Sequence, residues 1–248
     1  MNSLPILSSI KKYTKTKAHY AHKSLNINGL KRSHPYSVDF LLGCKNKHGI
    51  INPMDTFEKL HKSLHYIALF SKKKGSLLIV NTNKDLSNFI ENYYQSTHYK
   101  NLLQIADLSV CYCNEKWVGG FLTNWKQVSK SIHTFMEFSE RFENFIVQNN
   151  ISFPRYKKMN MSFQGLKKEK TIKRPDLIFL INPNDNRHVV EEALSLNIPV
   201  IAITDSNTNL LGISFPIPGN SNSVEFVHHC LQWITRIIVK NIGIKNIK

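Results

Sequence analysis

Two successive strand–helix units between residues 174 and 241 constrain the fold more than any other part of the chain. Leu177–Ile181 is a short apolar run without alternation, which is typical of a strand buried on both faces. Apolar residues then recur at helical spacing over His188–Leu196, and Ile198–Thr204 is a second buried strand. Because the connection between these strands has the length of a helix, we expect a parallel sheet that is covered on both sides.

The segments that follow predict the edge of this sheet and a last helix. Ile213–Ile217 is a third strand, and the proline inside it predicts a position at the sheet edge. Asn197 is expected to end the helix over His188–Leu196 in the left-handed conformation. Asn222 and Glu225 resemble a capping box, which predicts that a helix begins there.

The first half of the chain supplies the remaining strands and helices of the sheet. Leu77–Val80 and Leu108–Cys113 are further apolar runs of strand length. Asp55 and Glu58 predict a capping box for a helix that ends at Lys72–Gly75, with the glycine in the left-handed position. Five parallel strands are therefore expected, which start near Leu77, Leu108, Leu177, Ile198 and Ile213.

Positive charge is the most unusual property of the composition. The chain has 33 Lys and Arg against 17 Asp and Glu, a net charge of +16. Such an excess most often indicates a nucleic-acid partner, although a merely soluble basic surface is the alternative. Residues 1–38 hold seven basic side chains and no acid, and residues 155–174 hold eight basic side chains and one acid. The tract of lysines before Gly75 either stabilises the end of its helix or contacts nucleic acid.

The candidate nucleic-acid-binding residues lie in these two segments and in a basic turn after residue 44. They are Lys11, Lys12, Lys15, Lys17, Lys23, Lys31, Arg32, Lys45, Lys47, Arg155, Lys157, Lys158, Lys167, Lys168, Lys170, Lys173 and Arg174.

Four irregularly spaced cysteines predict no disulfide framework and favour a reducing compartment. Cys111 and Cys113 project from the same face of their strand and are expected to be buried, reduced thiols. His19 and His22 have a spacing that metal sites use, but no further ligands lie nearby, so no metal site is predicted. No apolar run approaches the roughly 20 residues that a membrane-spanning helix needs.

A parallel sheet also invites interpretation as an enzyme, because ligands bind beyond the carboxyl ends of such strands. The loops expected there are residues 81–84, 182–187 and 204–209. None contains a glycine-rich loop that could cradle a pyrophosphate, and their polar residues are better explained as helix caps and turns. We therefore predict no catalytic residues, no cofactor and no small-molecule substrate.

Four separated pieces of the second half carry a resemblance to a known family. Their order and spacing resemble the C-terminal half of the universal small-subunit ribosomal protein number two, in its bacterial and organellar form. A second match in the first half is the segment from Trp117 to Trp125. The four pieces are Arg174–Leu177, Asn186–Ala193, Asn197–Asn207 and Ile217–Asn220.

The resemblance implies a doubly wound, flavodoxin-like or Rossmann-like α/β domain that carries a helical insertion. The expected organisation is a basic arm over 1–38, a discontinuous α/β domain over 39–125 and 174–241, a basic helical insertion over 126–173 and a short tail over 242–248. The family has a helical hairpin in this insertion, and in this chain the apolar residues at helical spacing predict only its first helix. The structural signature residues are Trp117, Gly119, Gly120, Trp125, Asp205, Pro218 and Gly219.

The paired glycines of this signature lead to a physical prediction. At least one of Gly119 and Gly120 is expected to have a positive φ or to lie against another backbone without room for a Cβ atom. Valine at either position should then cost more than the roughly 1 kcal/mol expected for replacing an unstrained glycine.

The function implied by the resemblance is that of a structural constituent of the small ribosomal subunit, which binds rRNA and neighbouring ribosomal proteins. Lysine outnumbers arginine 27 to 6, which suggests an A+T-rich coding genome and favours a mitochondrial ribosome, with a plastid as the alternative. We expect no membrane partner and no homo-oligomer. The alternative function is a nucleotide- or metabolite-binding enzyme on the same fold.

Overall fold

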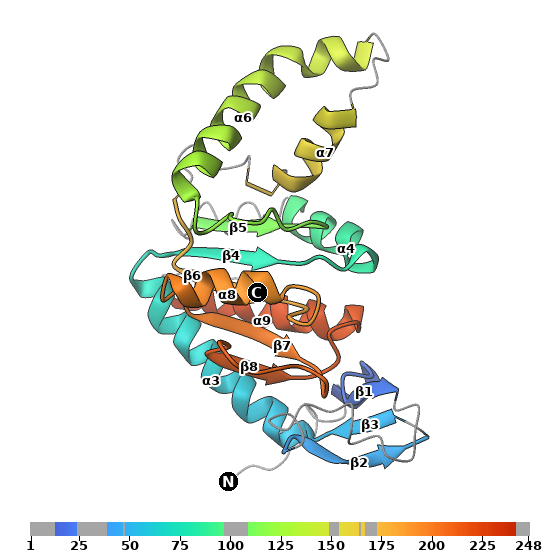
Figure 1. Ribbon diagram of the computed structural model, residues 1–248. Coiled ribbons are helices and arrows are strands. Elements are labelled where there is room, and N and C mark those ends of the chain that lie inside the picture. Colours follow the sequence, from blue (N-terminus) through green and yellow to red (C-terminus); the bar gives the residue numbers. More distant parts are fainter. Residues whose placement is uncertain are drawn as a thin grey trace.

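A five-stranded parallel sheet forms the centre of the molecule, with a small antiparallel sheet beyond one edge and a helical hairpin beyond the other (Figure 1). This arrangement comes from a computed structural model that describes residues 13–23, 39–46, 48–96, 109–148, 154–163, 165–166 and 173–241.

The parallel sheet has the strand order β5-β4-β6-β7-β8, which confirms the predicted doubly wound α/β fold. In the register of the central strands, Leu77 pairs with Val110 on one side and with Leu177 on the other. The strand that comes last in the sequence, β8, lies at one edge of this sheet, as its proline predicts. The strands are β4 (Ser76–Val80), β5 (Ser109–Cys113), β6 (Leu177–Leu180), β7 (Val200–Thr204) and β8 (Phe215–Pro218).

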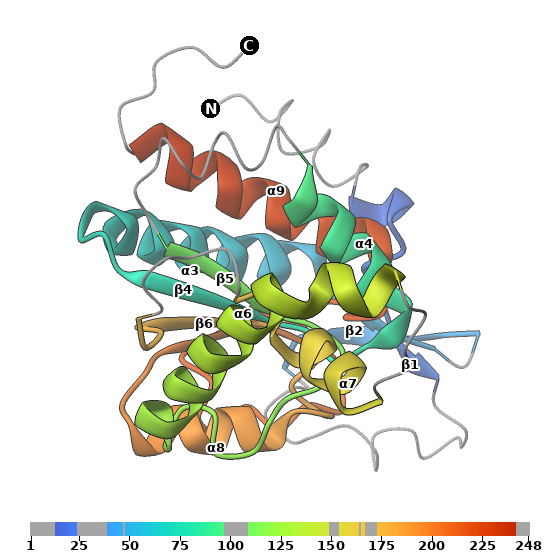
Figure 2. The same ribbon diagram turned by 90° about the horizontal axis from the view of Figure 1, so that it is seen from above.

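Helices cover both faces of this sheet (Figure 2). Leu77 and Ile79 of β4 pack into a core with α3, α4 and α9, whereas Leu78 and Val80 pack into a second core with α8. Alternate side chains of one strand therefore supply both cores, which explains why its sequence is apolar without alternation. The helices are α3 (Pro53–Lys72), α4 (Lys84–Gln95), α8 (Arg187–Ser195) and α9 (Val224–Asn241).

The insertion forms a hairpin of two unequal helices, α6 (Trp125–Gln148) and α7 (Pro154–Phe163). The long first arm was predicted, and the second arm exists but is short. Pro154 begins α7, because the fixed φ of proline suits the first turn of a helix. The ring of Phe135 lies 5.4 Å from that of Tyr156 and 5.9 Å from that of Phe163, measured between centroids, and these contacts hold the arms together.

The antiparallel sheet has the order β1-β3-β2, with β1 (Tyr20–Lys23), β2 (Leu41–Lys45) and β3 (His48–Ile51). Residues 13–23, which the sequence assigned to a basic arm, are thus folded. Tyr13 is 3% exposed and its hydroxyl lies 3.1 Å from the hydroxyl of Thr56 in α3.

The two predicted capping boxes are wrong, because a neighbouring residue caps each helix. Helix α3 begins at Pro53, and the backbone N–H of Met54 donates to the side-chain oxygen of Asn52 at 3.1 Å. The first helical position suits proline, so the cap moves to the residue before it. At α9 the hydroxyl of Ser223 accepts from the backbone N–H of Phe226 at 3.4 Å.

The ends of two helices test the predicted left-handed residues. Asn197 has φ 54°, which confirms the expectation for the end of α8. After α3 the left-handed residue is Lys74 with φ 53°, not Gly75. Gly75 leaves room for the ring of Phe70 instead, since a Cβ atom at this position would lie 2.3 Å from that ring and would displace it.

Candidate nucleic-acid interface

The turn between β5 and α6 is held by one carboxylate from α8. Oε1 of Glu192 accepts hydrogen bonds from the indole Nε1–H of Trp117 at 3.1 Å and from the backbone N–H of Gly120 at 2.9 Å. Oε2 accepts from the backbone N–H of Leu122 at 2.9 Å. Both oxygens of the side chain therefore bind the segment from which the insertion begins, and hydrogen bonds to a charged acceptor are the stronger kind.

The two glycines of this turn differ. Gly120 has φ 77°, which confirms the prediction that at least one of the pair adopts a positive φ. Gly119 has no atom within 4 Å of the position of a Cβ, and its φ is not in the left-handed region. The expectation that valine is costly at either glycine is therefore wrong for Gly119, because nothing there would clash with a side chain.

The two tryptophans of the turn enclose a buried phenylalanine. The ring of Phe121 lies 4.9 Å from that of Trp117 and 5.5 Å from that of Trp125, measured between centroids. Phe121 is 1% exposed and belongs to the core that includes α8. The segment from Trp117 to Trp125 is thus a packed and hydrogen-bonded base for the hairpin.

The remaining signature residues form turns after β7 and β8. Oδ1 of Asp205 accepts from the backbone N–H of Ser206 at 2.6 Å, which is the predicted role of a turn residue. Pro218 ends β8, and the N–H of Gly219 donates to the carbonyl of Thr204 at 2.9 Å.

The carboxyl edge of the sheet, where this fold class binds ligands, is crossed by side-chain hydrogen bonds. The loops that follow β5, β4, β6 and β7 are linked each to the next by side-chain hydrogen bonds, so amide groups that could meet a ligand are already engaged. The links run from Asn81 Nδ2 to Asn114 Oδ1 (2.8 Å), from Asn186 Nδ2 to Thr82 Oγ1 (2.7 Å) and from Asn184 Nδ2 to Asn207 Oδ1 (2.7 Å).

The opposite, amino edge of the sheet is strongly basic. Strands β4 and β6 are neighbours there, because the N–H of Asp176 donates to the carbonyl of Ser76 at 2.9 Å and the N–H of Ser76 donates to the carboxylate of Asp176 at 3.0 Å. Lys72–Lys74 precede the first of these strands, and Lys173 with Arg174 precede the second. All five basic side chains are exposed. We call these five residues the amino-edge cluster.

Sequence reasoning assigned two of the five residues of this cluster to the candidate interface. Lys173 and Arg174 were candidates, whereas the three lysines at the end of α3 were left between two explanations. The pairing of two strands that lie 100 residues apart brings them together, and no local pattern contains that information. The position of the lysines just before a predicted strand was the one available signal.

The other predicted residues are separated. Lys15, Lys17 and Lys45 are exposed at the antiparallel sheet, and Lys158 is exposed on α7 at the other end of the molecule (Figure 1). The side chains of Lys23, Arg155 and Lys157 lie outside the described part. The candidates that lie wholly outside the described residues are Lys11, Lys12, Lys31, Arg32, Lys47, Lys167, Lys168 and Lys170.

The cysteines lead to a prediction about chemical reactivity. Cys44 is exposed, whereas Cys111, Cys113 and Cys230 are buried free thiols, as predicted for the Cys111–Cys113 pair. Burial raises the pKa of Cys113 to about 12, which leaves almost no reactive thiolate near neutral pH. Iodoacetamide should therefore modify only Cys44 in the native protein and all four cysteines after denaturation. Mass spectrometry of tryptic peptides measures this, and rapid native labelling of Cys113 would contradict it.

No group of three or more His, Cys, Asp and Glu side chains within the described residues has the arrangement of a metal site. None of the described helices is both long enough and apolar enough to cross a membrane.

Comparison with known proteins agrees with this architecture. A model of the family "Ribosomal protein S2" matches residues 15–241. The chain is 34% identical to small ribosomal subunit protein uS2m of Marchantia polymorpha over 206 residues, which are 81% of either chain. It is 30% identical to uS2 of Bartonella quintana (strain Toulouse), over 83% of this chain and 74% of the relative. For uS2 of Rickettsia rickettsii (strain Sheila Smith) the identity is 26%, over 92% and 72%. The chain therefore belongs to the ribosomal protein S2 family.

Proposed function

We propose that this protein is a structural constituent of the small subunit of a mitochondrial ribosome, where it binds rRNA and neighbouring ribosomal proteins. The observation that carries the proposal is the family match, which spans both halves of the α/β domain and the insertion between them. The mitochondrial assignment is supported by the relative named uS2m and by the lysine-rich composition. The bacterial relatives are consistent with an organellar ribosome of bacterial descent.

The rRNA contacts are proposed to come from basic residues on the surface of a rigid domain. Lysine and arginine contacts to phosphate supply affinity and register without reading the sequence of the RNA. The amino-edge cluster brings five exposed basic residues to the edge of the sheet opposite the asparagine-linked loops. Basic residues of the segment over 1–38 and of the insertion over 126–173 are proposed to add further contacts.

Removing charge from the amino edge should weaken RNA binding in a salt-dependent way. We expect the double variant Lys73→Gln/Arg174→Gln to reduce the slope of log K against log salt by about two, because each lost phosphate contact removes about one released counterion. The matched control is Lys84→Gln/Lys116→Gln, which removes the same charge from exposed positions after β4 and β5, at the carboxyl edge. Binding of a transcript of the small-subunit rRNA, measured by filter retention over a salt series, gives both slopes. Equal slopes for the two variants would place the RNA elsewhere on the surface.

Sedimentation tests the proposed function itself. A tagged copy expressed in the source cells should travel with small subunits in a sucrose gradient of a mitochondrial lysate and remain there at moderate salt. The same gradient from a plastid fraction distinguishes the two organelles in a photosynthetic source. Recovery of the protein only at the top of every gradient would reject a ribosomal role.

A further inference from the structure

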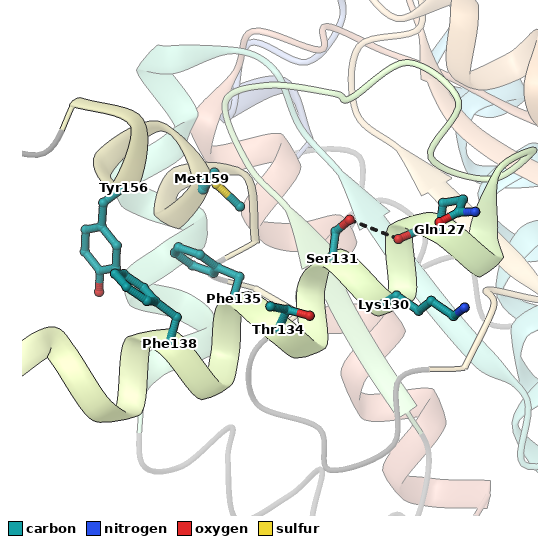
Figure 3. A pocket seen from close by; sticks show the side chains of 8 residues that line it. All are labelled: Gln127, Lys130, Ser131, Thr134, Phe135, Phe138, Tyr156 and Met159. Carbon is teal, nitrogen blue, oxygen red and sulfur yellow. Dashed lines mark hydrogen bonds between the residues drawn. The ribbon is translucent and has the colours of Figure 1, made fainter.

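A hollow of about 530 Å³ lies between the two arms of the insertion (Figure 3). The rings of Phe135, Phe138 and Tyr156 gather at one end of it, and Lys130 and Gln127 lie at the other end. Its size is that of a site for a small molecule or one small chemical group of a larger partner. One end is therefore aromatic and the other is polar and positively charged.

The aromatic end is exposed beyond what packing of the hairpin requires. Phe135 is 4% exposed and joins the arms, but Phe138 is 40% exposed and Phe142 is 45% exposed. The last two rings are stacked, with centroids 4.8 Å apart and an interplanar angle of 27°. Large exposed aromatic surfaces on a helix are unfavourable in water and commonly mark a binding site.

The charges around the hollow favour a polyanion. Lys130 lines it, and no acidic residue is among the lining residues. Arg141 lies on the same stripe of α6 as Lys130. The acidic Glu137 lies on that stripe too, with 3.3 Å between its Oε1 and Nδ1 of His133. The insertion, residues 126–173, contains ten basic and four acidic residues, so its net charge is positive.

Stacking surfaces beside cations are the combination that binds single-stranded nucleic acid. Aromatic side chains stack on unpaired bases of any sequence, and lysine attracts the neighbouring phosphate. Duplex RNA is recognised mainly through its phosphates and 2′-hydroxyl groups, so a duplex would leave these rings unused. A helix of a protein neighbour could also cover this apolar surface, but it would require neither the aromatic rings nor the charge of Lys130.

We propose that this hollow binds an unpaired RNA nucleotide, with its base stacked on Phe138 and a phosphate further along the same strand beside Lys130. The proposal deepens the proposed function, on which it depends for the source of the RNA. In the assembled subunit the nucleotide would come from a loop or bulge of the rRNA. The hairpin would then select unpaired RNA, while the α/β domain contacts phosphates.

A pair of substitutions at Phe138 separates stacking from simple apolar contact. Phe138→Leu keeps an apolar side chain that suits a helix but removes the ring, whereas Phe138→Trp keeps a ring. With the full-length protein and a fluorescently labelled oligouridine as the probe, we expect Phe138→Leu to weaken binding about tenfold and Phe138→Trp to bind at least as tightly as the wild type. The salt dependence should be unchanged in both, and Lys130→Gln should reduce it. Circular dichroism checks that each variant remains folded.

Two outcomes would overturn the inference. Wild-type affinity of Phe138→Leu for oligouridine would show that no base stacks there, and if that variant also failed to enter small subunits, a protein neighbour would be the occupant. Equal competition by a duplex of the same length would show that the hollow does not select unpaired RNA. Neither outcome touches the proposed function, which fails only if the wild-type protein does not sediment with small subunits.

Discussion

Replacing Glu192 by alanine is expected to lower the free energy of unfolding by about 3 kcal/mol. Its carboxylate accepts three N–H donors, from Trp117, Gly120 and Leu122, at distances of 2.9 to 3.1 Å. Alanine would leave these donors without an acceptor inside a turn that packs on a buried phenylalanine. Hydrogen bonds to a charged group contribute about 1.5–3 kcal/mol each, and partial replacement by water keeps the total below their sum.

The neighbouring glutamate provides a matched control. Glu191 lies on the same helix, and its carboxylate is within 3.8 Å of both Arg187 and His188 on the exposed face. Exposed ion pairs contribute little, so Glu191→Ala should cost less than about 0.5 kcal/mol. Urea unfolding followed by tryptophan fluorescence measures both variants, because Trp117 is itself a partner of Glu192. Equal losses for the two variants would show that the three hydrogen bonds contribute nothing specific.

The three hydrogen bonds of Glu192, which we call the clamp, also connect the stability of the domain with the position of the insertion. Glu192 belongs to α8, which covers the sheet, whereas its three partners lead directly into α6. Losing it should therefore affect the orientation of the hairpin before the sheet itself unfolds. We expect Glu192→Ala to enter small subunits less efficiently than Glu191→Ala, even at temperatures at which both variants are folded.

The sequence predicted β4, β6 and β7 well, because each of these central strands is a continuous apolar run that is buried on both faces. Helix boundaries were less predictable, since several polar residues stand side by side and each could act as a cap. At α3 both Asn52 and Asp55 were available, and Pro53 decides between them by fixing the first helical residue. At α9 Asn222 is already engaged, because its side-chain oxygen accepts from the side chain of Asn83 at 3.1 Å.

The features that matter for function were harder to predict, because they depend on residues that are far apart in the chain. The amino-edge cluster forms only when β4 and β6 pair, and the clamp joins residues that are 70 to 75 positions apart. A signal for the clamp was present: Glu192 borders the apolar face of its helix, three residues after the buried Val189. A carboxylate in such a place needs hydrogen-bond donors, but the sequence does not show which ones.

The folded part of the N-terminal segment was missed for a different reason. Tyr13 and Ala18 are buried, but the segment is too short and irregular to show a helical or strand period. Its position is fixed by long-range contacts with the last turn before α9. The hydroxyl of Ser223 donates to the carbonyl of Thr16 at 2.6 Å, and the N–H of Asn220 donates to the carbonyl of Ala18 at 3.0 Å.

Valine substitutions at the paired glycines should give opposite results. At Gly120 the backbone has φ 77°, a region that a β-branched residue adopts only with strain, so we expect Gly120→Val to lower the free energy of unfolding by about 2 kcal/mol. The N–H of Gly120 also binds Glu192, so any shift that relieves the strain would lengthen that hydrogen bond. At Gly119 a Cβ would meet open space, and Gly119→Val should cost no more than about 1 kcal/mol.

Urea unfolding of the two variants under identical conditions measures this difference. The double variant Gly120→Val/Glu192→Ala adds a further test, because the two residues share a hydrogen bond and their effects should not add. If strain at Gly120 acts by displacing the turn from the carboxylate, the double variant should lose less stability than the sum of the two single changes. Strict additivity would show that the strain stays within the turn and does not reach the clamp. Equal costs of valine at both glycines would contradict the difference between their backbone conformations.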